Sequence, residues 1–329
     1  MKSTSYTQII KTFNNGICFA HVAYELEKTF IKRNTGIKFQ QFWDFENLKS
    51  NISKFEVLTI SGLWDNKLLD KAKNLKFIQS IGAGYDQFDL KALKSRGIKL
   101  ANASGCNKNA VSEHAISMIL AFTRLLHDGR DNQKKHFWRP MISDSAIRED
   151  ELENKTMLLL GLGQIGSRIA RIAKAFDMHV TAIRQNPKLG KGTADEVHPI
   201  SNLNDLVPKA DFLVLACPLT EETKSIVDSN LLNKMKNSSY LINVARGGCV
   251  NDQDLLTALK KRQISGAAID HFNEDPLPES SPFWDLDNII ITPHSGGETR
   301  MYEENIIDIL LENLSILSLG NEELRNGVV

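Results

Sequence analysis

The sequence predicts an α/β protein built from two doubly wound parallel-sheet domains with a cleft between them. Three observations lead to this prediction. The chain has 329 residues, more than one ordinary hydrophobic core accommodates. Short apolar segments alternate with helix-length segments through most of the chain. A glycine turn near the middle stands directly between a strand pattern and a helix pattern.

The first third of the chain alternates short apolar segments with amphipathic ones, which is typical of strand–helix–strand units. The expected strands are residues 17–19, 57–60, 77–81 and 98–101. From Asn109, a candidate N-cap, apolar residues recur at helical spacing as far as Leu126, with Glu113 in the first turn. We therefore place a domain boundary just before this helix.

The second domain has the stronger pattern. A polar segment leads to an expected strand at 157–160, a glycine turn and a helix with apolar residues as far as Phe176. Further buried-type strands are expected at residues 180–183, 212–216, 240–244, 267–269 and 289–291. A last helix at 303–319 is expected to cross back to the first domain. The expected organisation is an outer domain of residues 1–106 and 299–329, and a second domain of residues 107–298.

Composition limits the function classes. Lys plus Arg and Asp plus Glu number 40 each, so no net field favours a nucleic-acid or membrane partner. Apolar residues make up 42% and charged residues 24%, as in a folded globular protein. The cysteines form no CxxC pair, which predicts neither disulfides nor a metal site and indicates a reducing compartment; they are Cys18, Cys106, Cys217 and Cys249. Without a signal-peptide core or a bilayer-length apolar run, we expect a soluble, cytoplasmic protein.

The glycine turn predicts a nucleotide site. Gly161, Gly163 and Gly166 form G-x-G-x-x-G directly after a strand and directly before a helix. In that context bare backbone can approach a pyrophosphate at the helix N-terminus. The turn therefore predicts a Rossmann-like dinucleotide site that includes Gln164 and Ile165; a plain glycine-rich turn is the alternative.

The next strand favours one form of the cofactor. It ends at Arg184, with no acidic residue that could bind a ribose 2′-hydroxyl. A guanidinium pairs with a 2′-phosphate instead, and Lys188 is a candidate second cation. The sequence thus favours NADP(H). NAD(H) is the alternative, in which Arg184 is a solvated surface residue.

Ligands on an open parallel sheet bind beyond the carboxyl ends of the strands, so the residues after each strand are candidates for the site. Arg246 and His294 both occupy such positions. An arginine anchors a carboxylate bidentately, and a histidine can release a proton near neutral pH. Each residue alone is more often a surface or structural residue. Behind a dinucleotide turn, the two together favour reduction of a carbonyl group.

Several stretches resemble the D-2-hydroxyacid dehydrogenase family, which includes glyoxylate/hydroxypyruvate reductases, D-lactate dehydrogenases and phosphoglycerate dehydrogenases. These stretches are residues 81–86, 107–114, 161–166, 243–248 and 291–294. The resemblance extends through most of the chain. It implies a D-specific oxidoreductase that transfers a hydride between NAD(P)H and a small 2-oxo or 2-hydroxy acid.

The resemblance also implies roles for individual residues. Arg246 would hold the substrate carboxylate and carbonyl, and His294 would be the general acid and base. The backbone amides of Ala83 and Gly84 would bind the other side of the carboxylate. Cofactor contacts are implied for residues in both halves of the second domain, namely Val111, Cys217, Pro218, Thr223, Val244, Ala245, Asp270 and Gly296.

The chain departs from the family at the third catalytic group, a glutamate before a proline that keeps the histidine protonated. Here Asp275 precedes Pro276, and Glu274 lies one residue earlier. An aspartate is shorter by one methylene, about 1.5 Å of reach, so either the loop moves in or the pairing is weaker. We favour Asp275 because the proline fixes the loop register, with Glu274 as the alternative. His271 stands where the family carries an apolar residue, and we interpret it as structural.

The resemblance bears on assembly and leaves function alternatives open. Trp138 matches an aromatic residue that in glyoxylate and hydroxypyruvate reductases reaches the partner subunit's active site. Packing at a dimer interface is the alternative, and both predict a homodimer. The function alternatives are a phosphoglycerate, formate or phosphite dehydrogenase, or a non-catalytic NAD(P)-sensing binding protein. The short stretch after the last helix disfavours the appended regulatory domain of many phosphoglycerate enzymes.

Overall fold

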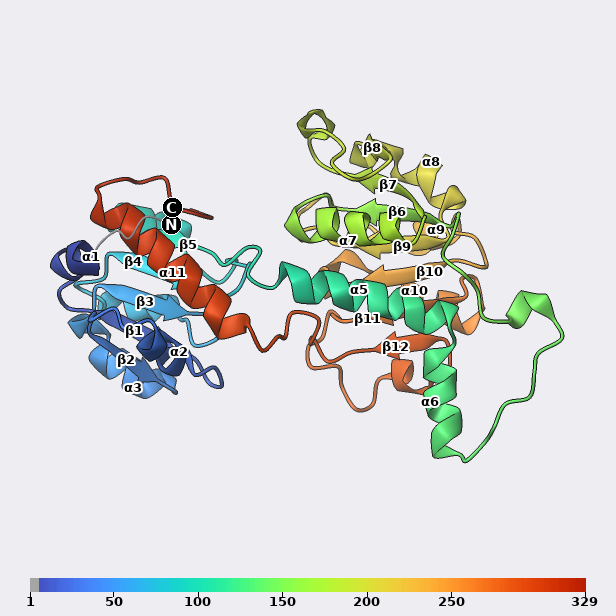
Figure 1. Cartoon of the computed structure of the whole chain (residues 1–329), viewed down its shortest axis with the longest axis horizontal. Coiled ribbons are helices and arrows are strands. Elements are labelled where there is room, and N and C mark those ends of the chain that lie inside the picture. The colour runs from blue at the N-terminus through green and yellow to red at the C-terminus, as the bar shows by residue number, and fades with distance from the viewer. Residues whose placement is uncertain (1–5) are drawn as a thin grey trace. The chain divides into compact units, whose positions relative to one another are not determined.

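The computed structural model describes residues 6–329 and divides the chain into two compact units. The smaller unit comprises residues 1–107 and 299–329, and the larger unit comprises residues 108–298. This division lies one residue from the boundary expected between 106 and 107. Each unit is a parallel sheet with helices on both faces (Figure 1), so the predicted α/β class with two doubly wound sheets is confirmed.

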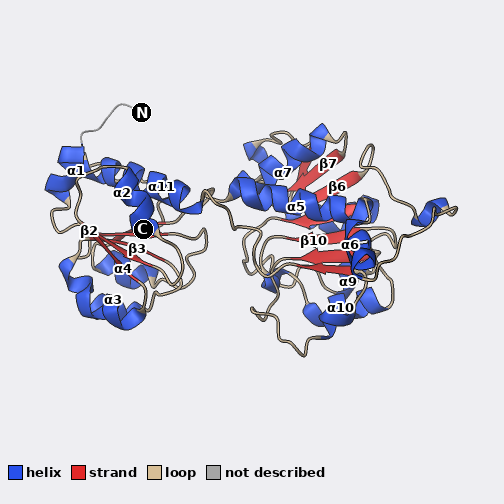
Figure 2. Cartoon of the chain, turned by 60° about the horizontal axis from the view of Figure 1, so that its bottom comes forward, coloured by secondary structure: helices blue, strands red, loops and turns tan. Residues whose placement is uncertain are grey.

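The smaller unit holds a five-stranded parallel sheet in the order β2-β1-β3-β4-β5. Its strands are β1 (Ile17–Ala20), β2 (Phe39–Phe42), β3 (Val57–Ile60), β4 (Phe77–Ser80) and β5 (Lys99–Ala101). One face is covered by α1 (Tyr6–Thr12), α2 (Leu26–Lys32) and α11 (Tyr302–Ser318), and the other by α3 (Phe45–Asn51) and α4 (Leu90–Ser95), as Figure 2 shows. Strands β1, β3 and β4 are buried throughout, as expected where helices cover both faces.

Helix α11 belongs to the smaller unit, although the whole larger unit precedes it in the chain. It packs against α1 and α2 through an apolar face that includes Ile306 and Leu310. The buried amide of Asn313 donates to Oε1 of Gln79 on β4 at 2.9 Å. The predicted helix at 303–319 is confirmed to within one residue at each end.

The larger unit holds a seven-stranded parallel sheet in the order β12-β11-β10-β9-β6-β7-β8. Its strands are β6 (Thr156–Leu160), β7 (His179–Ile183), β8 (Glu196–His198), β9 (Phe212–Leu215), β10 (Tyr240–Asn243), β11 (Gly266–Ile269) and β12 (Ile289–Ile291). The chain leaves β6 toward β7 and later resumes at β9 on the other side. The sheet therefore has a topological switch point between β6 and β9, where ligands bind in folds of this class.

Helices cover both faces of the larger sheet (Figure 2). They are α5 (Lys108–Thr123) and α7 (Gln164–Ala175) on one face, and α8 (Leu203–Leu206), α9 (Ser229–Leu232) and α10 (Asp252–Lys260) on the other. Short 3-10 helices connect the elements of both units at Ile52–Lys54, Asn66–Asp70, Ser145–Ile147, Pro187–Leu189, Ile200–Asn202, Val207–Lys209, Gly247–Cys249 and Pro282–Asp285.

The prediction of one continuous helix as far as Leu126 is wrong. Helix α5 ends at Thr123, and α6 (Leu126–Lys134) begins after Leu125, whose φ is 50°. A left-handed residue cannot continue a right-handed helix, so the chain turns there. The N-cap expected at Asn109 is also wrong, because α5 already begins one residue earlier.

Two short strands were not predicted. Strand β2 has the sequence FQQF and strand β8 has the sequence EVH, and both lie at sheet edges. Edge strands are covered less completely than central ones and tolerate polar residues. Neither segment carries the continuous apolar run that identified the central strands.

The glycine turn after β6 depends on two close backbone approaches. Gly161 has φ of 105°, and a Cβ there would lie 2.6 Å from the carbonyl oxygen of Ala216 at the end of β9. A Cβ on Gly166 would collide with the carbonyl oxygen of Gly161. Gly163, by contrast, faces open space, with no heavy atom within 4 Å of a Cβ. The first and third glycines therefore serve packing, and the second leaves room for a ligand.

Replacing Gly166 by alanine should lower the free energy of unfolding by about 1–3 kcal/mol, because the new methyl group overpacks the turn. Helix propensity alone favours alanine over glycine, so a net loss identifies the collision. Gly163→Ala is the matched control and should leave stability nearly unchanged, since its Cβ meets nothing. Urea denaturation followed by circular dichroism measures both. Equal stability of the two variants would contradict the packing role.

Candidate active site

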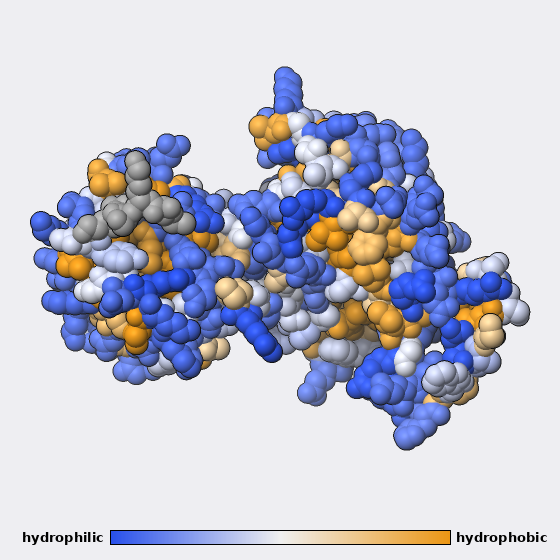
Figure 3. Space-filling view, viewed as in Figure 1, coloured by the Kyte–Doolittle hydropathy of each residue, from blue (hydrophilic) through white to orange (hydrophobic). Residues whose placement is uncertain are grey.

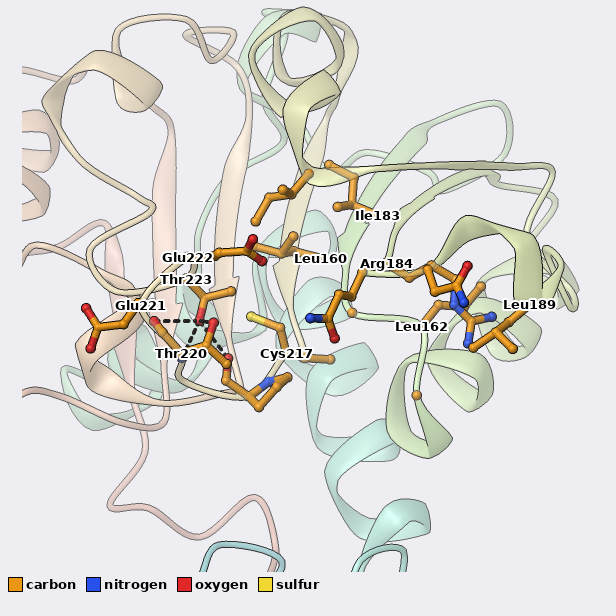
Figure 4. A pocket seen from close by; sticks show the side chains of 17 residues that line it. Leu160, Leu162, Ile183, Arg184, Leu189, Cys217, Thr220, Glu221, Glu222 and Thr223 are labelled. Atoms are coloured by element: carbon orange, nitrogen blue, oxygen red, sulfur yellow. Dashed lines mark hydrogen bonds between the residues drawn. The ribbon is translucent and has the colours of Figure 1, made fainter. Parts of the chain in front are cut away.

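A cavity of about 490 Å³ opens at the switch point of the larger sheet (Figure 4). Four parts of the chain line it: the glycine turn after β6, residues within 183–189 at the end of β7, Ile200, and residues within 216–223 after β9. Its volume is within the range of small-molecule sites. The parallel topology thus brings together the glycine turn, Arg184 and the segment with Cys217, Pro218 and Thr223, which were all predicted to bind the cofactor.

The cavity is bounded by the N-terminal end of α7 and by the loop after β9, which internal hydrogen bonds hold in place. Gly163 is the N-cap residue of α7, where backbone N–H groups are available to an anion. Opposite, the hydroxyl of Thr223 donates to the carbonyl oxygen of Pro218 at 2.7 Å and accepts from the amide of Thr220 at 2.7 Å. These residues fit a dinucleotide pyrophosphate, because the helix end supplies donors without a side chain in the way.

Arg184 lies at the far side of the same cavity, directly after β7 (Figure 4). Its Nη1 donates to the carbonyl oxygen of Gly190 at 3.0 Å, which anchors one branch of the guanidinium. The loop from Arg184 to Gly190 contains no acidic residue. Glu221 and Glu222 line the cavity from the loop after β9.

The turn after β10 carries Arg246. The buried side chain of Asn243 accepts from the amide of Ala245 at 3.0 Å and donates to the carbonyl oxygen of Arg246 at 3.1 Å. Nη1 of Arg246 donates to the carbonyl oxygen of Ala245 at 2.8 Å. Within residues 6–329 no carboxylate forms an ion pair with Arg246. The other guanidinium N–H groups are therefore available to an anionic ligand, while Val244 and Ala245 are buried.

A third close backbone approach joins this turn to the one after β11. A Cβ on Gly247 would collide with the carbonyl group of Phe272. Only glycine permits this approach, and it brings the Arg246 turn beside the segment that begins with Asp270. Arg246 consequently lies within electrostatic range of His271.

Asp270 follows β11 and holds the loop after β12. Its carboxylate accepts from the hydroxyl of Thr292 at 2.6 Å, from the amide of Ser295 at 2.9 Å and from the amide of Gly296 at 3.0 Å. Nε2 of His114 on α5 lies 3.5 Å away. Burial acts to raise the pKa of Asp270, but His114, Thr292 and the backbone amides outweigh it and hold this pKa well below its usual value. Asp270 is therefore ionised at neutral pH.

His294 stands in the loop that Asp270 holds. Its φ of 53° lies in the left-handed region, and its amide donates to the carbonyl oxygen of Asp270 at 3.0 Å. Such a conformation persists in a residue other than glycine only where surrounding contacts enforce it. Nδ1 of His294 lies 2.6 Å from Oδ2 of Asp275, so the shorter carboxylate reaches the imidazole. Glu274 is exposed beside it.

His271 is buried beside this pair. Its ring centroid lies 3.8 Å from that of His294, and neither of its ring nitrogens has a hydrogen-bond partner. Burial lowers the pKa of His271 to about 4, assisted by the positive charges of His294 and Arg246 and opposed by Asp270. His271 is therefore neutral at pH 7.

The remaining predicted residues belong to other segments of the chain. Ala83 and Gly84 follow β4 in the smaller unit, and within residues 6–329 their amides donate to no acceptor. Val111 is buried on α5. The side chain of Trp138 is 94% exposed in the segment after α6.

Two residues that support the cluster were not identified from the sequence. His114 contacts Asp270, and its Nε2 lies 3.0 Å from the hydroxyl oxygen of Thr292, which itself donates to Asp270. His114 follows Val111 by three residues, a spacing that places both on one side of α5. Thr292 directly follows β12. Those two positional signals could have identified the pair.

Two classes of site find no support in residues 6–329. That part of the chain contains no group of three or more His, Cys, Asp or Glu residues arranged to hold a metal ion. Its helices all lack the length or apolar content needed to cross a bilayer. The four cysteines are free and buried.

Comparisons with known proteins decide the family. Residues 116–296, more than half of the chain, match the family described as D-isomer specific 2-hydroxyacid dehydrogenase, NAD binding domain. The glyoxylate reductase of Thermofilum pendens is 32% identical over 260 residues, which cover 78% of this chain and 76% of that protein. The chain belongs to the D-isomer specific 2-hydroxyacid dehydrogenase family. The resemblance seen in the sequence is confirmed, and the larger unit contains a nicotinamide dinucleotide-binding domain.

Other proteins that are similar to this chain differ in length and in the chemistry that their descriptions give. The D-3-phosphoglycerate dehydrogenase of Synechocystis sp. is 32% identical over 286 residues, and this chain spans about half of its length, 50%. A solved structure described as an acyclic imino acid reductase, Bsp5, in complex with NADPH and D-Arg superposes with a TM-score of 0.80 at 25% identity. That match covers 95% of this chain and 100% of the other.

The free energy of unfolding should depend on pH through His271. In the unfolded chain its pKa returns to about 6.5, so between pH 4 and pH 6.5 the unfolded state binds more protons than the folded state. This contribution to stability is complete above pH 6.5 and is lost as the pH falls toward 4, by on the order of 3 kcal/mol.

His271→Val should remove this part of the pH dependence. Urea denaturation of the wild-type protein and the variant across this pH range provides the measurement. The same loss of stability toward acid in both proteins would show that His271 does not titrate as its burial requires.

Proposed function

We propose that this protein is an oxidoreductase that transfers a hydride between a nicotinamide cofactor and carbon 2 of a small 2-oxo or 2-hydroxy acid, with D specificity. The observation that carries the proposal is the pair of His294 with Asp275 at 2.6 Å, in the same unit as Arg246, which has no carboxylate partner among residues 6–329. A guanidinium anchors a carboxylate, and a carboxylate-paired imidazole is a suitable general acid. The glyoxylate reductase relative supports this substrate class.

In this proposal each residue has a defined role. Arg246 holds the substrate carboxylate with its free N–H groups and orients the carbonyl, and the amides of Ala83 and Gly84 bind the carboxylate as well. The bound cofactor supplies the hydride. His294 donates the proton on Nε2 to the carbonyl oxygen, because Nδ1 is engaged by Asp275, which stabilises the imidazolium. In the oxidation direction His294 takes the proton back.

In this proposal the two units have different binding roles. We assign cofactor binding to the larger unit through the glycine turn, Gln164 and Ile165, the loop from Cys217 to Thr223, and the buried positions at Val111, Val244, Ala245, Asp270 and Gly296. We assign substrate binding to the predicted outer domain, residues 1–106 and 299–329, together with Arg246 and His294 of the larger unit. Asp270 already accepts three hydrogen bonds, so its contribution to the cofactor site is chiefly to hold the neighbouring loop.

Arg246→Ala and His294→Ala should each lower kcat/KM for the 2-oxo acid by about 10²–10⁴-fold while the coenzyme still binds. The loss follows because one variant removes the carboxylate anchor and the other the proton donor. Turnover is measured by NADPH absorbance with glyoxylate, hydroxypyruvate, pyruvate and bulkier 2-oxo acids, and coenzyme binding by fluorescence titration.

Arg262→Ala is the matched control, because this exposed arginine pairs with Asp287 away from the cavity. Retention of most activity in either site variant would refute the proposed roles. Coenzyme binding by the wild-type protein without turnover of any acid or alcohol would instead favour an NAD(P)-sensing protein. Preference for 3-phosphoglycerate, formate or phosphite would identify one of the other dehydrogenase classes.

We propose that NADP(H) is the preferred cofactor. Arg184 lines the cavity at the end of β7, where an NAD-specific site requires an acidic residue. Lys188 in the same loop is exposed and supplies a second positive charge. The NADPH complex of the imino acid reductase shows that a protein of this architecture takes the phosphorylated cofactor, which supports the proposal.

Arg184→Asp should shift the ratio of kcat/KM with NADPH to that with NADH by at least about tenfold toward NADH, since a charged hydrogen bond to the 2′-phosphate is lost. Lys260→Asp on α10 makes the same change of charge at an exposed position outside the cavity and should leave the ratio unchanged. An unchanged ratio in Arg184→Asp would dispose of the phosphate contact.

We also propose that the protein is a cytoplasmic homodimer. Large apolar side chains are exposed along the segment from α6 to β6, and Figure 3 shows further apolar side chains gathered on one face of the larger unit. The exposed large apolar residues of this segment are Leu126, Phe137, Trp138, Met141 and Ile147. Exposure of this extent suits burial against a second copy of the chain. The free cysteines suit a reducing compartment.

A further inference from the structure

His271 is a buried imidazole that the proposed mechanism does not use. The residue is 8% exposed, and within residues 6–329 neither of its ring nitrogens has a hydrogen-bond partner. Oδ2 of Asp270 lies 3.5 Å from its Nδ1, too far and too poorly aligned for a hydrogen bond. Burying two polar atoms without partners is unfavourable, so the fold gains nothing from hydrogen bonding at this position. The explanation must come from what the ring touches.

The ring of His271 packs against the ring of His294. Their centroids are 3.8 Å apart and their planes meet at 54°. The side chain of His294 is 52% exposed, and that of its partner Asp275 is 45% exposed. An exposed ion pair holds its members only weakly, because water competes for both groups. The ring of His271 is buried, so water competes little for its contact with His294.

We infer that His271 is a positioning residue that holds the imidazole of His294 in its reactive orientation. Three supports then act on His294 together. Asp270 fixes the backbone of its loop, Asp275 engages Nδ1, and His271 provides a buried wall for the ring. The inference rests on the proposed reductase function, in which His294 must direct Nε2 at the substrate carbonyl.

The protonation state of His271 determines whether its ring can support the imidazole of His294. His294, Asp270, Arg246 and Asp275 all act on it, and His114 faces Asp270 from α5. Burial lowers the pKa of His271 to about 4, so at neutral pH its ring adds no positive charge beside His294 and Arg246. A neutral ring of this size supports His294 without opposing its protonation. Acid converts the same ring into a repelling neighbour.

The test compares substitutions of His271 that keep or remove a side chain packed against the imidazole of His294. His271→Val should lower kcat by about tenfold, since a small misplacement of a catalytic group is costly, while KM for the oxo acid and coenzyme affinity stay nearly unchanged. His271→Phe restores a ring and should recover kcat to within about threefold of wild type. His179→Val, at an exposed position on β7, is the control and should keep wild-type kcat. Thermal unfolding establishes that each variant is folded, and His271→Leu is the filled variant if phenylalanine prevents folding.

The acid side of the pH profile supplies a second readout. Below about pH 5, wild-type kcat should fall more steeply than that of His271→Phe, because only the wild-type ring gains a charge there. The inference would be overturned if His271→Val kept wild-type kcat. It would also be overturned if kcat of the filled variant were as low as that of His271→Val. Neither result would affect the proposed reductase function. Absence of turnover in the wild-type protein itself would overturn the proposed function, and with it the role given to His271.

Discussion

The carboxylate of Asp270 is the constraint on which the rest of the candidate site depends. It is buried at the end of β11, and it collects the hydroxyl of Thr292 and two amides of the loop after β12. Those bonds hold His294 in a backbone conformation that it would not keep in isolation. The contacts with Asp275 and His271 then act on a side chain whose backbone this carboxylate holds.

In the candidate site, buried residues support exposed ones. Asp270 and His271 are buried, whereas His294 and Asp275 are half exposed. The proposed proton donor must be exposed, because it has to reach the substrate. It also needs buried neighbours, because an ion pair that is open to solvent positions a side chain only weakly. Close backbone approaches that only glycine permits occur at Gly166, beside Gly161, and at Gly247, beside Phe272. The second brings the Arg246 turn next to the segment that begins with Asp270.

Sequence patterns predicted structural and site residues best at positions where one physical requirement allows few residue types. Gly161 and Gly166 were identified because the turn excludes side chains, and Arg246 and His294 because each closely follows a predicted apolar strand. The same rules missed His114, whose partner lies far along the chain, and misjudged the helix end at Leu125, where a left-handed residue carries no sequence signal. The edge strands β2 and β8 escaped because they are too polar to resemble buried strands.

By itself the sequence determined the α/β class, the position of the dinucleotide turn and the candidate acid and anchor, because each follows from periodicity or from residues adjacent in the chain. Only the tertiary structure decided that Asp275 contacts His294, that Asp270 holds the loop, and that His271 packs against the catalytic candidate. These contacts join separate strand ends and loops. Their geometry is set by backbone approaches that no local pattern encodes.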